Sequence, residues 1–195
     1  LAHNVSLGNC LEMAAEFRQS DKVTPIVLMG YLNPVETMGY ENFAAKAARA
    51  GVNGTIIVNL PPEEAVDMSA ILEANGIEPV YLLAPTTTDE RARMICQASK
   101  GFVYYVSLKG TTGAGNLDID DVSEKMGRFR KLSSLPIMVG FGVKDGPGAR
   151  AIVQVADGAV VGSAIVKLMA EHKGDLKKLG DEVGQFVSEL RAAID

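Results

Sequence analysis

Two short stretches in the last third of the chain decide the fold: Ile137-Met138-Val139-Gly140-Phe141-Gly142 and Ala159-Val160-Val161-Gly162-Ser163. Each is an apolar run that leads directly into glycine. A continuous apolar run, rather than an alternating one, is typical of a parallel strand buried on both faces. Glycine after such a strand lets backbone N–H groups approach an anion closely, and a helix starting at Ser163 would direct its free N–H groups to the same place. The two stretches predict parallel strands with an anion site at their carboxyl ends.

Four earlier apolar runs repeat this pattern, and predicted helices separate them. The runs cover Ile26–Met29, Thr55–Val58, Val80–Leu83 and Phe102–Val106. Apolar spacing predicts helices over residues 6–18, 36–50, 62–75, 119–132 and 147–156, with an amphipathic helix at the C-terminus. Strands begin at intervals of roughly 25–35 residues, which is the size of one βα unit.

Six βα units fit either a doubly wound parallel sheet or a (β/α)8 barrel. A complete barrel usually needs about 250 residues, so 195 residues with six units and a C-terminal helix amount to about three quarters of one. No Pro- or Ser-rich linker interrupts the chain. The sequence therefore predicts a single domain over residues 1–195.

Composition excludes several classes of function. The net charge of −5 argues against a general binder of nucleic acid or of a membrane surface, and no apolar run approaches the roughly 18 residues of a membrane span. Cys10 and Cys96 have no Cys or His nearby, which predicts free thiols and a cytoplasmic protein. His3 and His172 are isolated, so no metal site is predicted.

In both architectures the functional site lies at the carboxyl ends of the strands. Three consecutive units place glycine there, at Gly110–Gly115, Gly140–Gly142 and Gly162-Ser163, which favours a phosphate site. Neither a G-x-G-x-x-G nor a G-x-x-x-x-G-K-[ST] motif is present to support a dinucleotide or nucleoside triphosphate. Residues Lys109–Asp121 form either a mobile lid or a long surface connection. Tyr31, Leu82 and Tyr104 either line an apolar pocket beside the phosphate or belong to the core.

Several ordered motifs resemble the tryptophan synthase alpha subunit family, from Asn4 to the C-terminus. The motifs are Pro25-Ile26-Val27-Leu28-Met29-Gly30-Tyr31-Leu32-Asn33-Pro34, Leu60-Pro61-Pro62-Glu63-Glu64, Tyr104-Tyr105-Val106-Ser107 with Gly110-Thr111-Thr112-Gly113, Gly140-Phe141-Gly142-Val143, and Val161-Gly162-Ser163-Ala164-Ile165-Val166-Lys167.

The resemblance implies a (β/α)8 barrel that cleaves indole-3-glycerol phosphate to indole and glyceraldehyde 3-phosphate in tryptophan biosynthesis. It implies an α2β2 complex with the beta subunit, which carries pyridoxal phosphate, and no cofactor in the alpha subunit. It also makes Lys109–Asp121 a lid and the loop from Asn59 a beta-subunit contact. Two sets of residues follow from it: Gly113, Gly142, Gly162 and Ser163 hold the substrate phosphate, and Met29, Tyr31, Leu82, Tyr104, Thr112 and Phe141 lie near the indole and glycerol groups.

The sequence departs from the family pattern in ways that bear on activity. The family's catalytic Glu and Asp are expected upstream of the position that matches Leu1, so no catalytic residue is assigned within this chain. Asn59 stands where the family usually has Asp, Thr111 replaces the usual Val, and Leu108 replaces a common Arg. Two alternatives remain: another enzyme among the phosphate-binding barrels, and a truncated, non-catalytic remnant that binds a phosphate ligand or the beta subunit.

Overall fold

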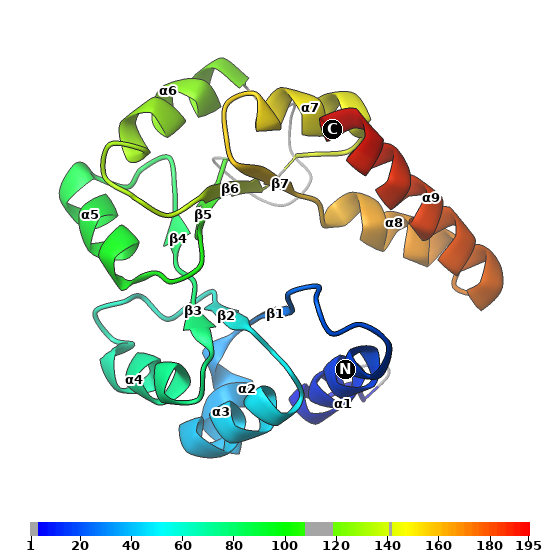
Figure 1. Ribbon diagram of the computed structural model, residues 1–195, viewed down its shortest axis with the longest axis horizontal. Coiled ribbons are helices and arrows are strands. Elements are labelled where there is room, and N and C mark those ends of the chain that lie inside the picture. Colours follow the sequence, from blue (N-terminus) through cyan, green and yellow to red (C-terminus); the bar gives the residue numbers. More distant parts are fainter. Residues whose placement is uncertain (1–3, 108–118, 141) are drawn as a thin grey trace. The chain divides into compact units, whose positions relative to one another are not determined.

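The computed structural model describes residues 4–107, 119–140 and 142–195. Helices and strands alternate along most of this part of the chain (Figure 1). The chain divides into two compact units, Leu1–Leu82 with Met94–Gly101 and Leu83–Arg93 with Phe102–Asp195. The prediction that residues 1–195 form a single domain is not tested by this division and stays a prediction.

The first unit is built on the parallel sheet β1-β2-β3. Strand β1 is paired with β2 in register from Val27 opposite Gly54 to Gly30 opposite Ile57. Helices α2, α3 and α4 lie along one face of this sheet (Figure 1), and Phe43, Ala47 and Met68 are buried there. The elements are α1 (Leu7–Ser20), β1 (Val27–Gly30), α2 (Leu32–Met38), α3 (Tyr40–Arg49), β2 (Gly54–Ile57), α4 (Val66–Ala74) and β3 (Glu78–Pro79).

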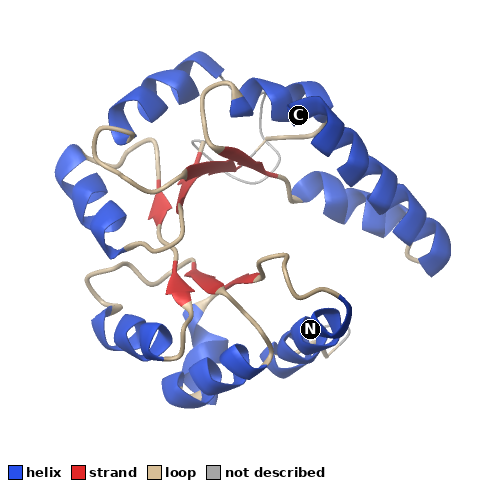
Figure 2. Ribbon diagram, in the orientation of Figure 1, coloured by secondary structure: helices blue, strands red, loops and turns tan. Residues whose placement is uncertain are grey.

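The second unit is built on the sheet β4-β5-β6-β7, in which β5, β6 and β7 are parallel. Figure 2 shows helices α6 and α7 along one face of this sheet. Tyr105, Phe129, Ile137 and Ile152 are fully buried between these layers. Two elements are divided between the units, β4 (Leu82–Leu83) and α5 (Asp89–Ala98). The others are β5 (Val103–Val106), α6 (Ile119–Phe129), β6 (Ile137–Gly140), α7 (Gly146–Val153), β7 (Gly158–Val160), α8 (Ser163–Glu171) and α9 (Leu176–Ile194).

The predicted strand Val80–Leu83 is replaced by two short strands on either side of Val80-Tyr81. The backbone N–H of Val80 still bonds Thr55 of β2 at 2.9 Å, but the next N–H, that of Tyr81, donates to the Ser99 hydroxyl at 3.2 Å. A side-chain acceptor therefore ends the first ladder, and the chain then enters the other sheet as β4.

The predicted helix over residues 36–50 is also wrong in its extent, since the structure has two helices, α2 and α3, joined at Gly39. Gly39 has φ +83°, a left-handed conformation that ends α2 and that residues with a side chain rarely adopt.

The inner strands β2, β5 and β6 are nearly continuously buried, as predicted. The outer strands β1 and β7 are only partly buried, and Met29 of β1 is 57 % exposed. None of the helices in the described ranges is long and apolar enough to cross a membrane.

Candidate functional site

The carboxyl ends of β6 and β7 bring two of the predicted phosphate residues to the same edge of the second sheet. Gly140 of β6 lies opposite Val160 of β7, and Gly142 and Gly162 each follow two residues later. Gly142 has φ +85°, a backbone conformation that residues with a side chain rarely adopt. Gly162 has an ordinary φ of −124°, and a Cβ there would meet nothing within 4 Å. Glycine at position 142 therefore permits the left-handed backbone conformation. Glycine at position 162 leaves the space beside the backbone open.

Helix α8 begins at this edge, with Gly162 as its N-cap and Ser163 as its first residue, as predicted. The first helical bond runs from the N–H of Val166 to the Gly162 carbonyl at 3.1 Å. No side chain in the described part of the chain caps this end. The first N–H groups of a helix have no partner inside the helix, and with the helix dipole they attract an anion. The arrangement is suited to bind a phosphate group.

Tyr104 of β5 is 6 % exposed, and its phenol lies across Gly140 of β6. A Cβ on Gly140 would collide with the hydroxyl and Cζ of Tyr104 and would come within 3.0 Å of Cε1. Burial raises the pKa of the Tyr104 hydroxyl above its ordinary value, so the phenol stays a hydrogen-bond donor to even higher pH than a free tyrosine. Ser107, which is also buried, donates from its N–H (3.1 Å) and its hydroxyl (2.8 Å) to the Gly140 carbonyl. These contacts fix the end of β6 against β5.

Tyr105, the next residue, lies on the opposite face of β5, because side chains alternate along a strand. Its ring centroid is 5.7 Å from that of Phe129 on α6. It is fully buried, and its hydroxyl has no hydrogen-bond partner in the described part of the chain. Burial and the nearby Asp121 carboxylate raise the pKa of Tyr105 to about 12, opposed by Arg128. Tyr105 therefore serves the core beneath the site.

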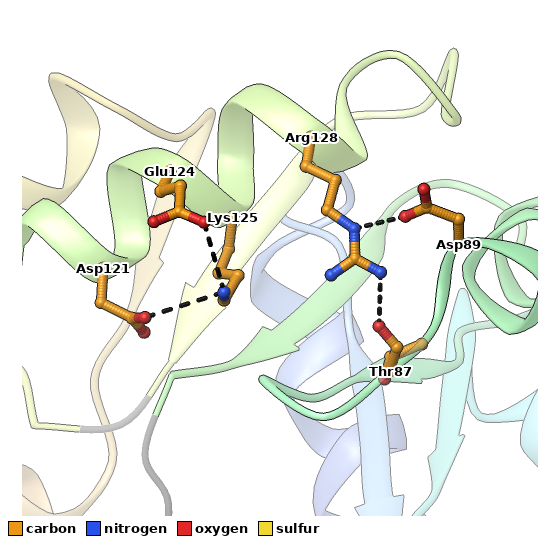
Figure 3. Close-up of polar contacts among 6 residues, drawn as sticks. All are labelled: Thr87, Asp89, Asp121, Glu124, Lys125 and Arg128. Carbon is orange, nitrogen blue, oxygen red and sulfur yellow. Dashed lines mark hydrogen bonds and ion pairs between the residues drawn. The ribbon is translucent and has the colours of Figure 1, made fainter.

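An arginine on α6 holds the loop that follows β4. Arg128 donates from Nε to the Asp89 carboxylate and from Nη2 to the Thr87 carbonyl at 2.7 Å (Figure 3). Thr87 in turn accepts the Ala84 N–H on its hydroxyl at 2.9 Å. Figure 3 also shows Lys125 between two carboxylates of its own helix, Asp121 and Glu124. The Arg128 contacts thus position the beginning of α5 against α6.

In the first unit, Met29 and Tyr31 are at the carboxyl end of β1. They are 57 % and 64 % exposed, and both line a pocket of about 250 Å³ with Leu28 and Pro34. The Asn59 side chain, from the loop after β2, accepts the Leu32 N–H on Oδ1 at 2.8 Å. Leu82, the first residue of β4, is partly buried.

Other predicted residues are outside the described ranges: Thr112, Gly113 and Phe141, and the lid up to residue 118. The last three residues of the proposed lid, 119–121, belong to α6. Among the described residues, no group of three His, Cys, Asp or Glu side chains could hold a metal ion.

Sequence reasoning assigned no structural role to two residues at these strand ends. Ser107 was noted only within a motif, and Asn59 only as a departure from the family pattern and as the start of a loop expected to contact the beta subunit. A small polar residue directly after a predicted strand was the available signal for both, because such a side chain can bond the neighbouring strand's backbone.

Known proteins match the whole chain. A family model described as tryptophan synthase alpha chain matches residues 1–195. The tryptophan synthase alpha chain of Thioalkalivibrio sulfidiphilus is 50 % identical over 195 residues, which is all of this chain and 73 % of that protein. The corresponding protein of Marinobacter nauticus is 47 % identical over 195 residues.

Solved structures agree with the sequence matches. Tryptophan synthase subunit alpha from Legionella pneumophila superposes with a TM-score of 0.89 at 38 % identity, covering 100 % of this chain and 72 % of that one. A structure of the tryptophan synthase α2β2 complex from Pyrococcus furiosus gives a TM-score of 0.87 at 36 % identity, covering 97 % of this chain and 75 % of that one. The predicted (β/α)8 class is confirmed, with this chain supplying successive parallel βα units and a C-terminal helix. The chain belongs to the tryptophan synthase alpha chain family.

Proposed function

We propose that this chain acts as a lyase in tryptophan biosynthesis, in the retro-aldol cleavage of indole-3-glycerol phosphate to indole and glyceraldehyde 3-phosphate. The observation that carries the proposal is the anion-binding edge formed by Gly142, Gly162 and the start of α8. A dianionic phosphate is the substrate group that such an edge recognises best. Family membership supports the same substrate.

Under this proposal Gly142, Gly162 and Ser163, together with Gly113, bind the phosphate. The free N–H groups of the first turn of α8 donate to the phosphate oxygens, and the Ser163 hydroxyl can add one further bond. Gly162 leaves room for the phosphate to reach the backbone, since a Cβ there would occupy open space.

The indole and glycerol groups are proposed to lie near Met29, Tyr31, Leu82, Tyr104, Thr112 and Phe141. Apolar and aromatic side chains suit the flat indole ring. The Tyr104 hydroxyl is a hydrogen-bond donor for a substrate oxygen.

Cleavage also requires a proton at the indole ring carbon and a base for the glycerol hydroxyl, and each such group contributes about 10²–10⁴-fold. The resemblance assigns these roles to a Glu and an Asp of the family. The residues named above would bind and orient the substrate. We further propose a cytoplasmic protein without a cofactor of its own, which pairs with a beta subunit in an α2β2 complex as in the Pyrococcus furiosus structure.

A charge placed at the start of α8 tests the proposal. Ser163→Asp puts a carboxylate where the phosphate would bind, yet an acidic residue in the first turn stabilises a helix. Two like charges 4 Å apart repel by about 4 kcal/mol at an effective dielectric constant of about 20. We therefore expect affinity for indole-3-glycerol phosphate to fall at least tenfold while the melting temperature is unchanged or higher.

The matched control is Leu176→Asp, because Leu176 is the first residue of α9 and is 80 % exposed. The chain contains no Trp, so the ligand carries the only indole ring and its fluorescence anisotropy reports binding directly. Leu176→Asp should bind like the unmodified chain. Unchanged affinity in Ser163→Asp would show that the phosphate does not bind at the start of α8. If the unmodified chain does not bind indole-3-glycerol phosphate at all, the proposed substrate is wrong.

A further inference from the structure

Tyr31 is held on both sides by the loop that follows β2. The carbonyl of Gly30, the residue before it, accepts the Val58 N–H at 2.9 Å. The N–H of Leu32, the residue after it, donates to Asn59 Oδ1 at 2.8 Å. The peptide groups that flank Tyr31 are therefore both bonded to the segment Val58-Asn59.

The second of these bonds replaces a missing backbone partner. The β1–β2 ladder ends with the pair Gly30 and Ile57, and Leu32 is the first residue of α2. Its N–H is among those that lack a partner inside the helix, and Tyr31, the N-cap, makes no side-chain cap bond. The Asn59 amide oxygen thus serves as the cap of α2, from a distant part of the sequence.

Asn59 is well placed to act as a fixed support. The next residue, Leu60, is 7 % exposed and donates its N–H to the Ile57 carbonyl at 3.2 Å. The turn after β2 is therefore anchored at both ends, and the amide between them is presented to α2. By contrast, the Tyr31 side chain is 64 % exposed, so its backbone bonds decide its position more than its packing does.

A second asparagine makes a matching bond at the other end of the same strands. Asn53 Oδ1 accepts the Ile26 N–H at 2.9 Å, just before β1 and β2 begin. It also accepts a bond from Arg18. In barrels of this class the carboxyl ends of strands carry function and the amino ends carry stability. Each asparagine thus accepts one backbone N–H beside β1, at opposite ends of the strand, and Asn53 bonds Arg18 in addition. A variant of Asn53 therefore serves as a comparison for a variant of Asn59.

We propose that Asn59 is a positioning residue for Tyr31, whose amide oxygen orients the Tyr31 backbone through the Leu32 N–H and so sets one wall of the indole site. The inference rests on the proposed function, because it takes Tyr31 to contact the indole group. Asn59 itself does not need to touch the substrate.

Three variants test the proposal: Asn59→Ala removes the acceptor, Asn59→Asp retains an acceptor of the same length, and Asn53→Ala is the matched control. A lost hydrogen bond of this kind corresponds to roughly a two- to tenfold change in an equilibrium. Asn59→Ala should weaken binding of indole-3-glycerol phosphate by that factor, measured by anisotropy of the indole ring. Asn59→Asp should stay within about twofold of the unmodified chain, and Asn53→Ala should lower the melting temperature without changing affinity.

Hydrogen exchange of the Leu32 amide gives a readout that does not depend on the substrate. We expect exchange to accelerate several-fold in Asn59→Ala, with a shift of the Tyr31 ring resonances, and to return toward its original rate in Asn59→Asp. Unchanged Leu32 exchange in Asn59→Ala would overturn the positioning role. Faster exchange with unchanged affinity would show that Tyr31 is not part of the binding site. Absence of binding in the unmodified chain would instead count against the proposed function.

Discussion

Gly140→Ala is the substitution whose consequence the structure specifies most closely. Gly140 ends β6, and the Tyr104 phenol of β5 occupies the space where a Cβ would lie. Tyr104 is 6 % exposed and forms part of a ladder with Met138 opposite it, so its ring cannot move aside without disturbing β5. The new methyl group must therefore displace either the ring or the strand.

The cost follows from the behaviour of overpacked cores. Adding a methyl group to a packed interior costs typically 1–3 kcal/mol. For a chain of this size a loss of 1 kcal/mol lowers the melting temperature by about 2–4 °C, so a loss near 2 kcal/mol lowers it by about 4–8 °C. Gly127→Ala is the matched control: Gly127 lies within α6 with nothing inside 4 Å of its Cβ position, and alanine there should gain up to about 1 kcal/mol.

Thermal unfolding of a double-mutant cycle with Tyr104→Ala measures the effect. Tyr104→Ala should itself destabilise by about 3–5 kcal/mol, as large aromatic truncations do. On that background Gly140→Ala should cost nothing, because the ring that it would strike is gone, giving a coupling of about 1–3 kcal/mol. An unchanged melting temperature for Gly140→Ala, or the same loss on both backgrounds, would refute the contact.

Two further predictions concern titratable groups. Tyr105→Phe should leave stability unchanged or raise it by up to about 1 kcal/mol in urea unfolding, because the buried hydroxyl lacks a partner in the described part of the chain; a loss above 1 kcal/mol would reveal a partner. Hydrogen bonds from the Thr24 hydroxyl and from the Thr24 and Val23 N–H groups lower the pKa of Asp21 to about 2. Since this folded value lies below the ordinary one, the stabilisation is complete above about pH 4 and is lost as the pH falls toward 2. NMR titration of the Asp21 carboxyl group should show the low pKa, and Thr24→Val should raise that pKa. A titration midpoint near pH 4 in the unmodified chain would contradict these hydrogen bonds.

The sequence predicted the strands well where the whole apolar run pairs within one sheet. The runs at Thr55–Val58, Phe102–Val106 and Ile137–Val139 correspond to β2, β5 and β6, because buried parallel strands need continuous apolar residues. The run at Val80–Leu83 was not predictable in detail. Its two ends pair in different sheets, and the switch depends on a Ser99 hydroxyl 18 residues away from Tyr81.

In the candidate site, too, the sequence predicted the local features but not the contacts between distant residues. Glycine after β6 and β7 and a helix start at Ser163 follow from local pattern, and the structure places them as predicted. The Asn59 bond to Leu32 spans 27 residues and the Ser107 bond to Gly140 spans 33. Periodicity carries no information on such distant pairs, so the supports of the site emerge only from the fold.

The measurement that tests the central claim most directly is a map of backbone amide shifts on adding indole-3-glycerol phosphate. The account predicts that the largest shifts occur at Gly142, Gly162, Ser163 and the following first-turn amides of α8. It also predicts that inorganic phosphate moves the same amides in the same direction at higher concentration. Shifts confined to the starts of other helices, such as α9 at Leu176, would contradict the assignment of the phosphate to this edge of the sheet.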